Sequence, residues 1–240
     1  MQTFAFLDES TAKHIVTTGL VAVPEVALAD AYLKIGQSKA RFGLPRDASI
    51  HCRILFHADA RRKSPFSNFS AENLDDLLMD CIIQLRTLGS TFWVAWVDRS
   101  KYPPTLRLFE GQEFRVTDKH LAGILSMAVT RALQDKMGTA PKLIYDPDRT
   151  KIDWGLARKM QASHFARITN HAQPSDQTTR PLVDIADVVA YSASHALLSP
   201  HEPHNRKLRR FVQYARIISP TLSHLSWGVP PVLSPSQDTR

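Results

Sequence analysis

The chain begins with a short apolar run that ends in two acids. Residues 4–7 read Phe-Ala-Phe-Leu, and Asp8, Glu9 and Ser10 follow directly. A run this short and apolar is typical of a buried strand rather than of a helix. A carboxylate at the tip of a buried strand is costly unless a cation lies beside it, and the simplest such cation is a metal ion. A metal site here would need more carboxylates of the same kind from the rest of the chain.

Two later apolar runs have the same design. Residues 91–97 form the strongest strand pattern in the chain and end in Asp98, and residues 142–145 end in Asp146. Asp98 and Asp146 are therefore candidates to join Asp8 at the ends of neighbouring strands.

A largely apolar helix supplies two further acids. It is predicted over 181–197 and carries Asp184 and Asp187. These acids are three residues apart, so they occupy neighbouring positions on one helical face. A helix this apolar packs against a sheet, which keeps its acids out of open water.

The remaining patterns predict an α/β chain with one main domain. Two more strands are predicted over 15–23 and 50–56, a weaker one over 164–168, a basic loop over 57–66, and helices over 25–41, 70–88, 118–136 and 205–218. We expect residues 1–199 to form this domain and residues 200–240 to form a basic C-terminal helix and tail.

Acids at strand ends converge only if those strands run parallel and side by side, and parallel strands need crossover helices. The predicted order of elements matches the ribonuclease H fold, with a mixed central sheet of order 3-2-1-4-5 flanked by helices. In that order the strands of Asp8 and Asp98 are neighbours, roughly 4.8 Å apart. Asp187 would approach from the last helix, and Asp146 would flank the pair.

Clustered carboxylates repel one another unless a counter-charge is present. Hard divalent cations such as Mg²⁺ or Mn²⁺ prefer an all-oxygen shell and supply that charge. Two such ions about 4 Å apart allow in-line attack of water on a phosphodiester. In this interpretation Asp8, Asp98 and Asp187 are the principal ligands, and Asp146 and Asp184 assist them.

Each acid also has a plain structural explanation. An acid after a strand is often a turn residue or a helix cap, and Asp184 alone fits a first-turn acid favoured by the helix dipole. These explanations must hold separately for every acid, so the set carries more weight than its members.

The charge of the chain favours an anionic partner. The net charge is +7 and the pI is about 9.6, which is typical of nucleic-acid-binding proteins as well as of many mildly basic soluble ones. Candidate phosphate contacts follow two of the predicted strands: Arg61, Arg62 and Lys63, then Arg149 and Lys151. A solvated loop would have the same composition.

We expect a cytoplasmic protein without a membrane span. No stretch approaches the roughly 20 apolar residues that a span needs, and the N-terminus has no secretion-signal pattern. Cys52 and Cys81 lie in apolar predicted elements, which indicates core thiols rather than a disulfide framework.

Four stretches resemble the bacterial and phage family called domain of unknown function 3800, in the ribonuclease H-like superfamily. They are residues 6–10 (FLDES), 50–66, 96–99 (WVDR) and 181–191 (PLVDIADVVAY). The resemblance implies a nuclease-like fold with an acidic site made by Asp8, Asp98, Asp146 and Asp187. It does not imply activity, because a fold is not a function.

The chain departs from that family at two acids. The family commonly has Glu where Asp146 stands, and Gln where Asp184 stands. Asp184 with Asp187 is similar to the paired acids on the last helix of Holliday-junction resolvases. His51 matches a family histidine that would hold a water or a phosphate, although a strand-end histidine bonded to backbone fits equally.

Two functional interpretations follow. The first is a metal-dependent nuclease acting on DNA or RNA, with Glu9 and His51 supporting the ligands. The second is an inactive ribonuclease H-like module that binds nucleic acid or a protein partner. Alternation along the first strand turns Glu9 away from Asp8, so Glu9 ranks as a supporting residue.

Overall fold

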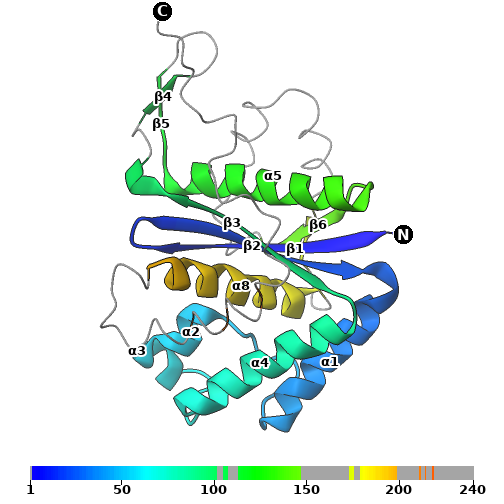
Figure 1. The fold of residues 1–240 in the computed structure, drawn as a ribbon. Helices are drawn as coiled ribbons and strands as arrows, with labels where there is room; N and C mark the ends of the chain where they lie inside the picture. Colours follow the sequence, from blue (N-terminus) through cyan, green and yellow to red (C-terminus); the bar gives the residue numbers. More distant parts are fainter. Residues whose placement is uncertain are drawn as a thin grey trace, which may run out of the picture.

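A mixed β-sheet forms the centre of the molecule, with helices on both faces (Figure 1). The structure is a computed structural model, and it describes residues 2–101, 105–107, 113–146, 173–175 and 179–198, together with Phe211, Tyr214 and Ile218. The predicted α/β class with a mixed, helix-flanked sheet is confirmed.

The sheet is built around one long hairpin. Strands β1 (Thr3–Ala12) and β2 (Ile15–Pro24) pair antiparallel, and β3 (Thr91–Asp98) pairs antiparallel with β2. On the other side of β1, strand β6 (Lys142–Tyr145) runs parallel to it, and the two-residue β7 (Gln173–Pro174) pairs in parallel with β6. The order is therefore β3-β2-β1-β6-β7.

The strand predicted over 50–56 is wrong. The segment enters in an extended conformation and turns into helix α2 (Cys52–Phe56), whose first turn closes on the carbonyl of His51 through the amides of Ile54 (2.8 Å) and Leu55 (3.0 Å). Its buried residues, Cys52 and Leu55, are three apart, which is helical spacing.

Loss of that strand changes the neighbours of β1. The strand that ends in Asp98 occupies the sheet edge beside β2, and the strand that ends before Asp146 lies beside β1. The expectation that the strands of Asp8 and Asp98 are adjacent is therefore wrong.

The longer predicted helices form, with the expected end signals. Helix α4 (Ala71–Thr87) begins with a capping box between Ser70 and Asn73, and α5 (Asp118–Met137) ends at Gly138, which has the positive φ (70°) that favours glycine. The remaining described elements are η1 (Glu25–Ala27), α1 (Leu28–Arg41), α3 (Ala58–Arg62), η2 (Arg99–Lys101), the hairpin β4 (Thr105–Arg107) and β5 (Glu113–Arg115), and α8 (Arg180–Leu198). Part of the predicted 57–66 loop is thus the short helix α3.

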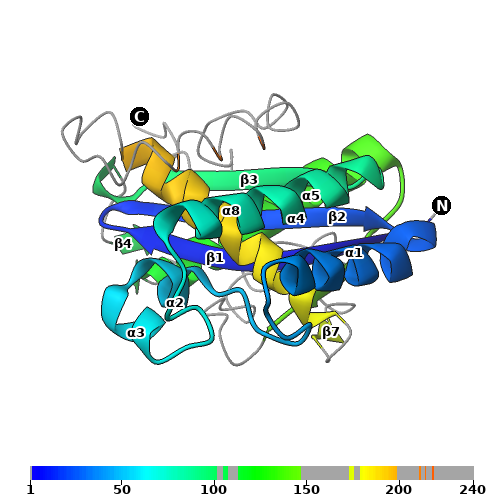
Figure 2. The ribbon, with the colours of Figure 1, turned by 90° about the horizontal axis from the view of Figure 1, so that it is seen from below.

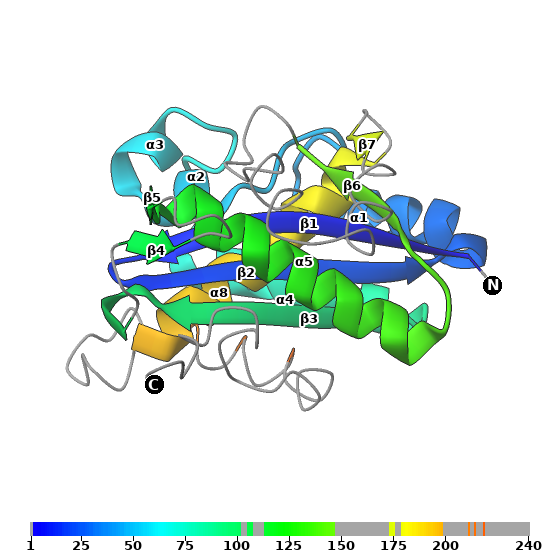
Figure 3. The same ribbon diagram turned by 90° about the horizontal axis from the view of Figure 1, so that it is seen from above.

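The two faces of the sheet carry different helices. Figure 3 shows α5 crossing one face, where it covers Ala5 and Leu7 of β1. Figure 2 shows α8 crossing the opposite face with α1 and α4 near it, and there Phe6 packs into the core. Because side chains alternate along a strand, Asp8 and Ser10 face α8 with Phe6.

Phe211, Tyr214 and Ile218 are helical and buried in the same core as α8. The Phe211 ring lies edge-on to Phe56, 4.9 Å between centroids. The predicted strand over 164–168 and the rest of the predicted 205–218 helix lie outside the described residues. None of the helices in the described part of the chain combines the length and apolar character that a bilayer crossing requires.

Candidate functional site

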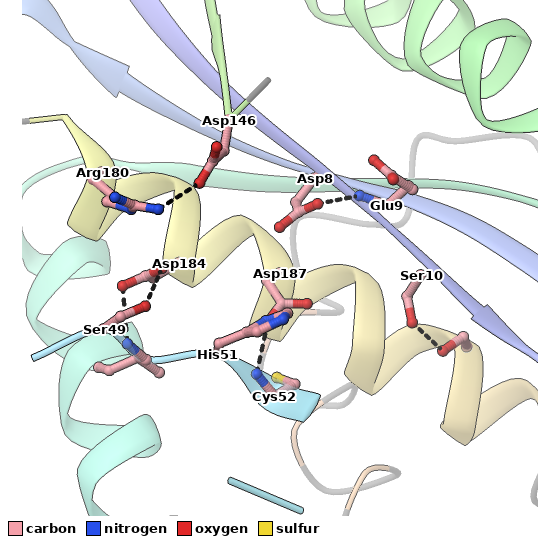
Figure 4. A network of polar contacts seen from close by, with 12 residues as sticks. Asp8, Glu9, Ser10, Ser49, His51, Cys52, Asp146, Arg180, Asp184 and Asp187 are labelled. Atoms are coloured by element: carbon pink, nitrogen blue, oxygen red, sulfur yellow. Dashed lines mark hydrogen bonds and ion pairs between the residues drawn. The ribbon is translucent and has the colours of Figure 1, made fainter. Parts of the chain in front are cut away.

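Asp8 lies on the central strand and faces α8. It is 4% exposed, and its Oδ1 accepts a hydrogen bond from the Glu9 amide at 2.8 Å. Strand β1 continues to Ala12, so alternation turns Glu9 to the α5 face, as predicted, and Figure 4 shows the two acids pointing apart.

Asp146 comes next to Asp8 in the register of the sheet. The last bridged pair between the parallel strands is Leu7 with Tyr145, so Asp8 and Asp146 each follow directly. Ile144 packs in the α8-side core, which places Asp146 on that same face. The buried Asp146 carboxylate accepts a bond from Arg180 at 3.2 Å and turns toward it (Figure 4).

Close packing of α8 on β2 brings Asp187 over the middle of β1, where Asp8 lies; β1 continues to Ala12, so the prediction that Asp8 stands at the tip of its strand is wrong. Gly19 is the cross-strand partner of Asp8, and a Cβ on Gly19 would lie 2.6 Å from both the Ala186 carbonyl oxygen and the Ala190 nitrogen. Only a glycine permits that approach. Asp187, adjacent to Ala186, therefore lies over the same part of the sheet as Asp8.

Polar contacts hold α8 along this path. The Thr17 hydroxyl donates to the Ala190 carbonyl at 2.9 Å, and the hydroxyls of Ser10 and Ser194 are 3.3 Å apart. These contacts fix the position of the helix on the sheet.

The Asp187 carboxylate has one oxygen anchored. Its Oδ2 accepts the Cys52 amide at 2.7 Å and lies 2.8 Å from His51 Nδ1. Its Oδ1 receives no hydrogen bond from any residue that the structure describes. His51 thus orients Asp187. Its predicted supporting role beside a metal site stays a prediction.

Asp184 holds the loop before α2. Its Oδ1 accepts the Ser49 hydroxyl at 3.1 Å, and its Oδ2 accepts the Ile50 amide at 2.9 Å. With Asp187 it ties residues 49–52 to α8. Each of its oxygens already serves the loop, so its predicted role as a metal ligand stays a prediction.

The pKa of the Cys52 thiol reflects the carboxylates around it. Burial, followed by the charges of Asp187, Asp8 and Asp184, raises the pKa of the Cys52 thiol well above its usual value. Burial also lowers the pKa of Lys39, a buried lysine whose charge Asp184 favours. Three acids therefore share one poorly solvated region.

Asp98 lies away from this group. It pairs with Ile15, whereas the residue of β3 level with Asp8 is Val94. The four-residue offset is about 13 Å along the strand, and two strand spacings add roughly 10 Å across the sheet. The predicted pairing of Asp8 with Asp98 is wrong because β2 lies between their strands.

The surroundings of Asp98 explain it as a turn residue. Its Oδ1 accepts the Ser100 hydroxyl (2.6 Å) and amide (3.0 Å), and Lys101 lies 3.8 Å away. Burial opposes ionisation, but the Ser100 bonds, with His14 and Lys101 nearby, hold the pKa of Asp98 below its usual value. The plain structural explanation, an acid capping a turn, applies here.

The predicted phosphate contacts fall partly within the described chain. Arg61 donates to the Leu55 carbonyl at 3.2 Å, Arg62 lies 3.5 Å from Asp59, and Lys63 is exposed. Their role in nucleic-acid binding stays a prediction. Arg149 and Lys151 lie outside the described residues.

Sequence reasoning missed Arg180 as a member of the site. Its position four residues before Asp184 would suggest an ion pair within the helix. It reaches Asp146 instead, because β6 ends beside the start of α8. An arginine just before an acid-bearing helix is the signal that was present in the sequence.

The carboxylates lie near one another but do not form a complete set of metal ligands. Among the described residues, no group of three or more histidine, cysteine or acidic side chains is placed to hold a metal ion. Figure 4 shows the reason: Asp146 turns to Arg180 and Asp184 turns to the 49–50 loop, which leaves Asp8 and Asp187 facing the space between β1 and α8. Comparisons with family models, with curated proteins and with solved structures gave no match.

Proposed function

We propose that this chain is a divalent-metal-dependent nuclease with a ribonuclease H-like fold. The observation that carries the proposal is the placement of two buried carboxylates, Asp8 on the central strand and Asp187 on the helix packed over its partner strand. A third acid, Asp146, stands next to Asp8 in the parallel register.

The sheet supports the fold part of the proposal. Counted in chain order, its four longer strands lie 3-2-1-4, with the first three antiparallel and the fourth parallel to the first, and the two-residue β7 would take the fifth place. Strand β3 is the third strand, a place predicted from sequence for residues 50–56. Strand β6 is the fourth, a place predicted for residues 91–97. With this assignment the acid after the fourth strand is Asp146, so we propose Asp8, Asp146 and Asp187 as the site and leave Asp98 out.

The donor set fits a hard cation with few protein ligands. All the candidate ligands are carboxylate oxygens, which suit Mg²⁺ or Mn²⁺. Mg²⁺ commonly keeps several waters and binds through one or two carboxylates plus substrate phosphates, rather than through a cage made by the protein alone. Asp8 and Asp187 would hold the ion, and it would supply charge stabilisation and an activated water for phosphodiester cleavage.

The chain's own residues prepare this site. His51 and the Cys52 amide fix Asp187 through Oδ2, and among the described residues its Oδ1 accepts no hydrogen bond. Arg180 neutralises Asp146 and, being half-exposed, can also face a substrate phosphate. Membership of the domain of unknown function 3800 family, a nucleic-acid partner and a cytoplasmic setting belong to the same proposal.

The test is metal-dependent cleavage with a positional control. Purified protein should cleave DNA or RNA with Mn²⁺ or Mg²⁺, and Asp8→Asn should abolish both cleavage and the heat of metal binding in calorimetry. Asp98→Asn removes a strand-end carboxylate outside the proposed site and should retain both. No cleavage across single- and double-stranded substrates, or equal losses in the two variants, would refute the proposal.

A second function is supported by the anchored carboxylates. Asp184 and Asp187 both accept hydrogen bonds from the 49–52 backbone, and Asp146 forms an ion pair with Arg180. These contacts give all three acids a structural role that needs no metal. In that case the chain is an inactive module that binds nucleic acid or a partner. Salt-sensitive binding that survives both Asp8→Asn and Asp187→Asn, with no metal binding by the wild type, would select this function.

A further inference from the structure

A hollow of about 480 Å³ lies between helices α1 and α4, in the helical layer farther from the sheet (Figure 1). It is lined by Lys34, Gln37, Ala40, Arg41, Arg46 and Gln84. The lining therefore presents three cations and two amides, and it contains no carboxylate.

The charges of the hollow are only partly neutralised. Arg41 forms an ion pair with Asp80 of α4 and also donates to the Ser38 hydroxyl. Lys34 and Arg46 have no ion pair with any residue in the described part of the chain. The hollow thus offers two uncompensated positive charges to an anion.

Arg46 contacts helix α1 through both its backbone and its stem. Its backbone carbonyl accepts a bond from the buried Lys39 ammonium at 3.3 Å. Its aliphatic stem lies against Gly36, close enough that a Cβ there would stand 3.6 Å from Arg46 Cδ. These contacts place the Arg46 side chain beside the hollow.

We propose that this hollow binds the sugar–phosphate backbone of a nucleic-acid strand, an inference that rests on the proposed function. Small-molecule sites enclose most of their ligand in largely apolar walls, whereas this hollow is open and five of its six lining side chains are cations or amides. Lysine and arginine side chains at an open surface are the usual contacts to backbone phosphates.

The chain runs directly from the hollow to the loop that Asp184 anchors. Arg46 stands three residues before Ser49, whose hydroxyl donates to Asp184. Three residues span at most about 11 Å. A strand whose backbone rests on Arg46 therefore passes within reach of the loop that α8 anchors.

Binding is measured without metal, so that cleavage plays no part. A fluorescein-labelled single-stranded DNA is titrated in EDTA over a salt series, with wild type and with Lys34→Gln/Arg46→Gln. Each lost phosphate contact lowers the slope of log K against log salt by about 0.7. The double variant should reduce that slope by about 1.4 and bind more weakly at every salt concentration.

The control removes the same charge from the opposite face. Lys119→Gln/Arg131→Gln changes two cations of α5 and should leave the slope unchanged, with circular dichroism confirming that both variants fold. Equal slopes in the two double variants, or no binding of DNA by wild type, would overturn the proposal. Binding of inorganic pyrophosphate at Lys34 and Arg46 without binding of DNA would overturn it too, in favour of a free phosphate ligand.

The outcome is separable from that of the nuclease proposal. If metal-dependent cleavage is insensitive to Lys34→Gln/Arg46→Gln, the proposal that the hollow binds nucleic acid is refuted and the nuclease proposal is retained. If DNA binding depends on the hollow but no metal supports cleavage, the nuclease proposal is refuted and the hollow is retained as a binding site.

Discussion

Gly19→Ala should disturb both stability and the acidic site, because α8 touches β2 at this glycine. A Cβ at Gly19 would lie 2.6 Å from backbone atoms of Ala186 and Ala190, whereas ordinary contact begins near 3.4 Å. The helix must therefore withdraw by about 0.8 Å, since neither backbone atom can rotate away. Overpacking of this kind costs about 1–3 kcal/mol, which lowers Tm by roughly 2–12 °C for a domain of this size.

The same displacement separates Asp187 from Asp8. We expect Gly19→Ala to weaken metal binding in calorimetry as well as to lower Tm by circular dichroism. Gly36→Ala is the matched control: its Cβ would meet only the Arg46 stem at 3.6 Å, and alanine in mid-helix gains about 1 kcal/mol over glycine. A Gly19→Ala protein as stable as wild type would refute the packing argument.

Two further predictions concern the other acids. Arg180→Gln removes the ion pair between Arg180 and the buried Asp146 and should lower the free energy of unfolding by about 1–2 kcal/mol in denaturant, discounted because Arg180 is half-exposed. Mg²⁺ should stabilise this variant more than wild type, and unchanged stability would contradict the contribution of this pair. The folded state lowers the pKa of Asp98. The ionised Asp98 therefore contributes fully to the free energy of unfolding above its ordinary pKa of 3.8, and this contribution is lost as pH falls through the folded-state pKa. Asp98→Asn should therefore be less stable than wild type at pH 7 and should match it in acid, and a difference that persists at low pH would argue against this linkage.

Much of the fold follows from local pattern. The apolar runs at residues 4–7, 91–97 and 142–145 are strands, and the 3.6-residue periodicity of α4, α5 and α8 places these helices correctly. These segments are long or strongly patterned, so their local preferences agree with their tertiary surroundings. Residues 50–56 fail because His51 and Arg53 give an alternation typical of a strand, while Cys52 and Leu55 also have the spacing of one helical face.

One misassigned segment was enough to change the predicted site. With 50–56 taken as the third strand, Asp98 moves beside Asp8 and Asp146 moves to the flank. The register of the real sheet reverses those two positions. Strand adjacency is a long-range property that no local pattern encodes, whereas the proposal of Asp8 and Asp187 as site acids depends only on elements that were predicted correctly.

The two acids of α8 show where sequence reasoning ends. Both are buried on the same helix, and spacing alone makes them equivalent candidates. The structure separates them by the hydrogen bonds that they accept: Asp184 uses both oxygens on Ser49 and Ile50, while Asp187 uses Oδ2 alone. Because Oδ1 of Asp187 accepts no hydrogen bond from a described residue, Asp187 fits the proposed metal site better than Asp184, which holds the loop that carries His51. The backbone amides that make this distinction leave no mark in the sequence, since every residue but proline has one.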